Sequence, residues 1–127
     1  SDLSYPFELS GGMNQRVGIM MAMLMKPDLL LADEPTSALD VIAQRQVVDI
    51  FKDIKCSGDT SMIIVSHNIN VVRELADKII VMKSGRIVEY EDTEIIMDYP
   101  KQEYTKQLIS AVPVLRQECA DEYNIRA

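Results

Sequence analysis

A short apolar run that leads straight into two adjacent carboxylates is the strongest constraint on the fold of this chain. Leu29 to Ala32 is continuously apolar, and Asp33 and Glu34 follow it directly. Such a run is typical of a parallel strand that is covered on both faces. Ser61 to Val65 predicts a second buried strand, which ends at Ser66-His67-Asn68. Because open α/β sheets bind ligands at the carboxyl ends of their strands, we expect both polar groups at one rim.

Helical patterns separate and follow these two strands. Helices are predicted over 11–26, 40–55 and 70–76. Asp40 is placed to cap the second helix, because its short acidic side chain can accept hydrogen bonds from the free N–H groups of a first turn. The apolar residues expected on the buried faces are Val17, Met20, Met21 and Leu24 in the first helix and Val47, Ile50, Phe51 and Ile54 in the second.

The last third of the chain predicts a hairpin and a helical tail. The runs 79–82 and 86–90 flank Lys83-Ser84-Gly85, in which the glycine is expected to take a positive φ angle. Helices are expected over 93–97 and 102–111, with a last weak segment over 115–123, packed against the side of the domain. The predicted fold class is therefore α/β, with a mostly parallel sheet, an antiparallel edge hairpin and a helical C-terminal tail.

Composition excludes several classes of function. The net charge of -7 has the wrong sign for a protein that neutralises nucleic-acid phosphates, so we expect no nucleic-acid partner. The longest apolar run, 17–25, is shorter than the roughly 20 residues of a membrane-spanning helix. No secretory signal is visible, which favours cytosolic exposure. Cys56 and Cys119 are isolated and are expected to be reduced, incidental thiols, with any role left open.

The acidic pair and the single histidine are the candidate reactive groups. Adjacent residues at the end of an extended strand point to opposite sides, so Asp33 and Glu34 can serve different tasks. Asp33 is the candidate Mg²⁺ contact, through the water shell of the ion, and Glu34 the candidate general base. His67 could hydrogen-bond a phosphate oxygen or hold the attacking water. The alternatives are a solvated acidic turn and an ordinary surface histidine.

A serine and two glycines open the first predicted helix. Gly11 and Gly12 lack side chains, so their N–H groups and the helix dipole can approach an anion, with the Ser10 hydroxyl beside them. A γ-phosphate is the natural ligand, although the same residues also suit a simple capped helix start. The 127 residues contain no match to G-x-x-x-x-G-K-[ST], the loop that wraps nucleotide phosphates.

Taken in this order, the motifs of residues 9–90 resemble the C-terminal two thirds of an ATP-binding cassette (ABC) ATPase, a P-loop NTPase domain. By resemblance, 9–13 is the signature motif, 29–33 the Walker B strand and 37–40 the D-loop. Glu34 is then the catalytic glutamate and His67 the switch histidine, while Ser10, Gly11, Gly12 and Asp40 bind the nucleotide. The resemblance divides the chain into the end of a helical subdomain (1–28), the core (29–90) and a C-terminal helical extension (91–127).

The resemblance also implies a subgroup and partners. Met13 stands where glutamine is common, and this variant, with Tyr5-Pro6 before it and 104–113 later, is similar to the ATPases of peptide and nickel importers. In that family two subunits sandwich ATP and Mg²⁺, so Ser10, Gly11 and Gly12 would act on the nucleotide held by the other subunit. Transmembrane permease subunits would be further partners. The chain would then sit peripherally on the cytoplasmic face of the membrane.

Without the phosphate loop, residues 1–127 are expected to bind ATP weakly and not to hydrolyse it alone, as a fragment or split product of such a subunit. A soluble ABC ATPase of DNA repair or chromosome organisation is an alternative, against which the acidic pI and the 104–113 tail speak. A non-catalytic interaction module is another. The transported substrate, and whether the subunits form a homodimer or a heterodimer, stay open.

Overall fold

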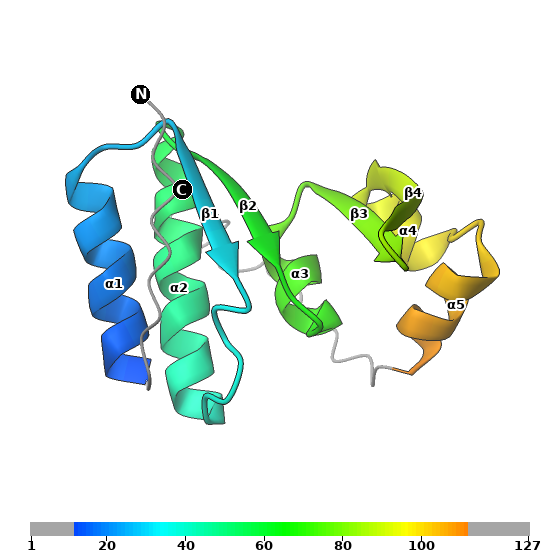
Figure 1. Cartoon of the computed structure of the whole chain (residues 1–127), viewed down its shortest axis with the longest axis horizontal. Helices are drawn as coiled ribbons and strands as arrows, with labels where there is room; N and C mark the ends of the chain where they lie inside the picture. Colours follow the sequence, from blue (N-terminus) through cyan, green and yellow to red (C-terminus); the bar gives the residue numbers. More distant parts are fainter. Residues whose placement is uncertain (1–11, 112–127) are drawn as a thin grey trace, which may run out of the picture.

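Helices and strands alternate up to residue 83, and a further strand and two helices follow, in a computed structural model that describes residues 12–111 (Figure 1). The elements of the first part are α1 (Gly12–Leu24), β1 (Leu29–Asp33), α2 (Val41–Ser57), β2 (Ser61–Val65) and α3 (Ile69–Leu75). Those of the second part are β3 (Lys78–Lys83), β4 (Arg86–Asp92), α4 (Thr93–Asp98) and α5 (Glu103–Ser110). The α/β class predicted from the sequence is confirmed, and the segment 115–123 lies outside the described residues.

The first sheet is a parallel pair. β1 and β2 pair in register from Leu29 opposite Ser61 to Asp33 opposite Val65. The pairing continues one residue beyond β1, where the Glu34 N–H donates to the Val65 carbonyl at 2.7 Å. Both strands therefore end at the same rim, as the sequence predicts.

Helix α2 forms as its sequence predicts. The Asp40 carboxylate accepts from the Ala43 N–H at 2.7 Å and caps the first turn. Gly58, with φ 74°, ends the helix in the left-handed conformation that glycine adopts most easily. Between these caps, Val47 and Phe51 have no exposed surface.

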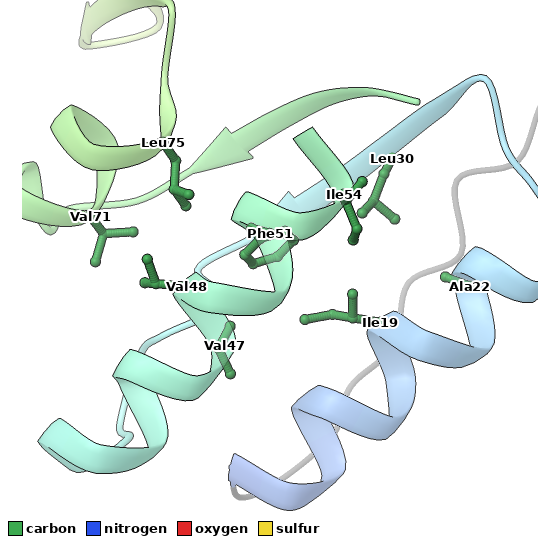
Figure 2. Packing of buried hydrophobic residues seen from close by; sticks show 9 residues of the cluster. All are labelled: Ile19, Ala22, Leu30, Val47, Val48, Phe51, Ile54, Val71 and Leu75. Atoms are coloured by element: carbon green, nitrogen blue, oxygen red, sulfur yellow. The ribbon is translucent and has the colours of Figure 1, made fainter. Parts of the chain in front are cut away.

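The main hydrophobic core lies between α1, α2, α3 and one face of the parallel strands. Figure 2 shows its nine buried side chains, which come from elements far apart in the sequence. They are Ile19, Ala22, Leu30, Val47, Val48, Phe51, Ile54, Val71 and Leu75. The alternate strand residues Ala32, Met62 and Ile64 pack against this cluster and are partly buried.

The opposite face of the parallel strands is open in the described part of the chain, so the prediction of strands buried on both faces is wrong there. Side chains alternate between the two faces of a strand, and Leu29, Leu31, Ile63 and Val65 are 41–54% exposed. A continuous apolar run shows that both faces can be buried. It does not show that the described elements cover both.

The predicted buried face of the first helix is also wrong. Val17, Met20, Met21 and Leu24 are 47–80% exposed, whereas Ile19 and Ala22 are buried against α2. Apolar residues continue around most of the C-terminal half of α1, so helical spacing fits more than one stripe. Packing against α2 determines that Ile19 and Ala22 form the buried stripe, which the spacing of apolar residues alone could not indicate.

The hairpin is a second, antiparallel sheet. β3 and β4 are joined at Ser84 and Gly85, whose φ angles of 51° and 74° suit a tight hairpin turn. Within residues 12–111 this hairpin pairs with neither β1 nor β2, so it does not extend the parallel sheet as an edge. Its own core consists of Ile79, Val81 and Ile96.

The helices α4 and α5 pack against this hairpin. The sequence predicts only that the tail packs against the side of the domain. Glu89 on β4 is buried, and its carboxylate accepts from the N–H groups of Lys101, at 3.1 Å, and Gln102, at 3.0 Å. These two N–H groups lie directly before α5, which begins at Glu103. Desolvation alone would raise the pKa of Glu89. The two backbone hydrogen bonds, together with the Thr105 hydroxyl and the charge of Lys101, outweigh it and lower the pKa below the ordinary value of 4.5.

None of the helices in the described ranges is long and apolar enough to cross a membrane.

Phe51→Ala is expected to lower the free energy of unfolding by about 3–5 kcal/mol, because it removes a fully buried ring from the main core. Urea denaturation followed by circular dichroism measures this loss. Ile42→Ala is the control on the same helix, since Ile42 is 73% exposed and its loss should stay within about 0.5 kcal/mol. Similar losses in both variants would contradict the core described above.

Acid is expected to weaken the junction between the hairpin and α5. A carboxyl whose pKa is lowered by folding stabilises the fold above its unfolded pKa, and this contribution is lost as the pH falls through the lower folded value. Thermal unfolding of wild type and Glu89→Gln between pH 7 and pH 3 measures it. The wild type should lose more stability than Glu89→Gln below the ordinary pKa of 4.5. Parallel curves would show that Glu89 does not contribute.

Candidate functional site

The structure brings Glu34 and His67 together at the rim where β1 and β2 end. The His67 Nε2 atom lies 3.2 Å from Glu34 Oε1, although 33 positions separate the two residues in the sequence. Glu34 follows the last residue of β1, and His67 follows β2 by two positions. Asp33 occupies the end of β1 and is exposed. The juxtaposition follows directly from the parallel register of the two strands.

Glu34 has an unusual backbone. Its φ angle is 49°, in the left-handed region that residues other than glycine rarely adopt. The extended geometry assumed for Asp33 and Glu34 in the sequence analysis is therefore wrong at Glu34, where the chain has already left the strand. Such conformations cost roughly 1–3 kcal/mol and occur often at functional sites. The hydrogen bond from the Glu34 N–H to Val65 holds this residue in place.

The two side chains have very different surroundings. The Glu34 side chain is 30% exposed and that of His67 is 98% exposed. The Oε1 atom of Glu34 is itself buried and has no hydrogen-bond partner among the described residues. The 3.2 Å separation from His67 is therefore an ion-pair distance without hydrogen-bond geometry. A buried acceptor without a donor suits a water molecule that would donate to it.

An open depression of about 490 Å³ lies over these two residues. Its lining is completed by Thr36 and Ser37, from the turn after Glu34, and by Asn68. Thr36 is buried, and the Ser37 N–H donates to the Glu34 carbonyl at 3.2 Å. Our sequence analysis did not predict Thr36 and Asn68 as site residues. Two features of the sequence could have indicated these residues: Thr36 carries a hydroxyl directly after Glu34-Pro35, and Asn68 carries an amide directly after His67.

The turn that carries His67 is fixed by its neighbours. The Asn68 Oδ1 atom accepts from the N–H groups of Asn70, at 3.1 Å, and Val71, at 3.4 Å, and so caps α3. The Asn68 N–H donates to Ser66 Oγ at 3.0 Å. Hydrogen bonds on both sides of His67 therefore define the backbone from which its ring projects.

Charged side chains join α2 to α3 behind the site. Glu74 accepts from Arg45 at 2.7 Å and lies 2.6 Å from the Lys52 ammonium group. Desolvation would raise the pKa of Glu74, but the hydrogen bonds and positive charges of Arg45 and Lys52 outweigh desolvation and lower this pKa. The hydrogen bond to Glu74 correspondingly raises the pKa of Arg45. The helix that follows Asp40 and the helix that follows His67 are thus held together.

The remaining predicted site residues either do not line the depression over Glu34 and His67 or lie outside the described residues. Asp40 is exposed, and its carboxylate is occupied in capping α2. Gly12 is the first residue of α1, while Ser10 and Gly11 lie outside the described residues. No cluster of three or more potential metal ligands occurs between residues 12 and 111. The Mg²⁺ contact expected of Asp33 stays a prediction. Cys56 is exposed, and Cys119 also lies outside the described part.

Comparison with known proteins gives a consistent result. A family model described as ABC transporter matches residues 2–37. The metal-staphylopine import system ATP-binding protein CntD of Staphylococcus aureus is 47% identical over 107 residues, which are 84% of this chain and 40% of that protein. The dipeptide transport ATP-binding protein DppD of Bacillus subtilis is 44% identical over 111 residues, which are 87% of this chain and 33% of that protein.

A solved structure agrees with these relatives. It is the ATP-binding cassette MJ0796 in a dimeric post-hydrolysis state bound to ADP and Pi, which superimposes with a TM-score of 0.58 at 35% identity. The match covers 69% of this chain and 38% of that one. The chain thus spans well under half the length of the proteins that it matches. Its motifs, its α/β fold and these relatives together show that the chain belongs to the ABC transporter ATP-binding protein family.

Proposed function

We propose that this chain forms part of an ATP-hydrolysing subunit of an ABC importer for peptides or metals. The observation that carries the proposal is the position of Glu34, which lies 3.2 Å from His67 and has a buried oxygen without a donor. The names of the relatives support the importer class, since CntD belongs to a metal-staphylopine import system and DppD to dipeptide transport.

In this proposal Glu34 accepts a hydrogen bond from the attacking water and acts as its general base. The orphaned Oε1 atom is the acceptor, and partial burial strengthens its attraction for a proton donor. His67 donates from its exposed imidazole to a phosphate oxygen or to the same water. Asp33 would hold Mg²⁺ through water, and the ion would neutralise charge on the phosphate oxygens when bound.

Other residues are proposed to act on a second subunit. Ser10, Gly11 and Gly12 would present N–H and hydroxyl donors to the γ-phosphate of ATP held by the partner, and Asp40 would line the same interface. The dimeric state of the solved cassette bound to ADP and Pi supports this arrangement. Transmembrane permease subunits would then bind the assembled pair, with the chain peripheral to the cytoplasmic face of the membrane.

The phosphate loop required for turnover has no match in residues 1–127. Purified residues 1–127 are therefore expected to release no phosphate from ATP above background, because too few groups contact the nucleotide. A sensitive phosphate-release assay with and without Mg²⁺ tests this. Magnesium-dependent turnover that disappears in Glu34→Gln would contradict it.

Glu34→Gln is expected to reduce kcat by roughly 10²- to 10⁴-fold when it is made in an ATP-hydrolysing assembly that contains this chain. The reason is that an amide cannot accept the proton of the attacking water. KM for ATP should change little, since Glu34 contacts water rather than the nucleotide in this proposal. Steady-state phosphate release measures both constants.

Glu94→Gln is the matched control, because it makes the same chemical change at an exposed position of α4. It should leave kcat unchanged. Equal activity of Glu34→Gln and Glu94→Gln would remove Glu34 from the chemical step.

A further inference from the structure

We propose that Asn68 is a positioning residue for His67, and this inference rests on the function proposed above. The two residues are adjacent in sequence, and both line the depression over Glu34. Asn68 acts through the turn that it caps, and no direct contact with the nucleotide is required of it.

The first step is the exposure of the histidine ring. The His67 side chain is 98% exposed, so packing contributes almost nothing to its orientation. The ring can remain 3.2 Å from Glu34 only if the backbone that carries it is held in place. Whatever fixes that backbone therefore also fixes the distance between the two candidate reactive groups.

The second step is the set of hydrogen bonds made by Asn68. Its side-chain oxygen accepts from two N–H groups at the start of α3, and its own N–H donates to Ser66 Oγ on the other side of His67. Replacing an Asn cap by alanine leaves the first-turn donors unpaired and typically destabilises the helix start. An unpaired first turn would free the segment between β2 and α3 to move.

The third step links this turn to α2. The Asn68 Nδ2 atom lies 3.5 Å from Gln44 Oε1, on the first turns of α2. Val71, one of the residues that Asn68 caps, is buried in the main core with Val48 and Phe51 of α2. Asn68 therefore connects the histidine turn to the helix that begins directly after Asp40.

The chain offers a direct spectroscopic test, because it contains one histidine and its imidazole signals need no assignment among several rings. Nuclear Overhauser contacts between the His67 ring and the Glu34 side chain are measured in the 127-residue chain. Asn68→Ala should abolish these contacts. Asn68→Asp should restore them, since a carboxylate also accepts from the N–H groups of Asn70 and Val71.

Thr93→Ala is the control for a general loss of stability. Its hydroxyl donates to the Ala76 carbonyl at 2.5 Å, at the start of α4 and away from the site. This variant should keep the contacts between His67 and Glu34. Contacts that survive in Asn68→Ala, or that disappear equally in Thr93→Ala, would overturn the positioning role.

Turnover in an ATP-hydrolysing assembly separates this inference from the proposed function. Asn68→Ala should lower kcat roughly ten- to a hundredfold with little change in KM, because the misplaced group acts in the chemical step. In a His67→Ala background it should have no further effect. A full additional loss in that background would overturn the positioning role.

A different result would bear on the function itself. If His67→Ala alone leaves turnover unchanged, the catalytic role proposed for His67 is wrong. The spectroscopic contacts would still decide whether Asn68 positions the ring.

Discussion

The parallel hydrogen bonding between β1 and β2 is the constraint on which the site depends. Asp33 lies opposite Val65, and the Glu34 N–H extends the ladder to the Val65 carbonyl. A slip of one residue in this register would turn every side chain of one strand to the other face. Leu30 would then leave the core, and Glu34 would no longer meet His67. The packing of the core and the geometry of the site therefore follow from the same set of backbone hydrogen bonds.

Helices α2 and α3 hold the loops that follow β1 and β2 in a defined arrangement. Asp40 starts α2 and Asn68 starts α3, so each loop of the site ends in a capped helix. Glu74 joins the two helices through Arg45 and Lys52, and buried side chains join them on the core side. Removing one partner from such a partly buried charge network leaves the others desolvated without compensation. The reactive side chains can be exposed because the elements behind them are held together.

Much of this architecture could be predicted because local and long-range signals agree. In α2, the predicted cap at Asp40 and the predicted stripe through Phe51 indicate the same helix, and both are present in the structure. The meeting of Glu34 and His67 follows from topology, since parallel neighbours end at one rim.

Other features could not be predicted because they depend on what lies nearby in space. The buried stripe of α1 is chosen by α2, and the covered face of the strands is chosen by the helices that are present. The left-handed φ of Glu34 accompanies a hydrogen bond to Val65 on the neighbouring strand, which no spacing along the sequence encodes. Ser10 and Gly11 lie outside the described residues, so their predicted role stays a prediction.

The separation of the two sheets has a consequence for motion. The parallel pair and the hairpin share no ladder within the described residues, and each is built around its own hydrophobic cluster. Val72 in α3 and Ala76, directly after that helix, pack against the cluster of the hairpin. Cooperative units of this kind can open separately, and their amides then exchange with solvent at different rates. The hairpin and the rim that carries Glu34 and His67 therefore belong to separate hydrophobic units, which α3 joins.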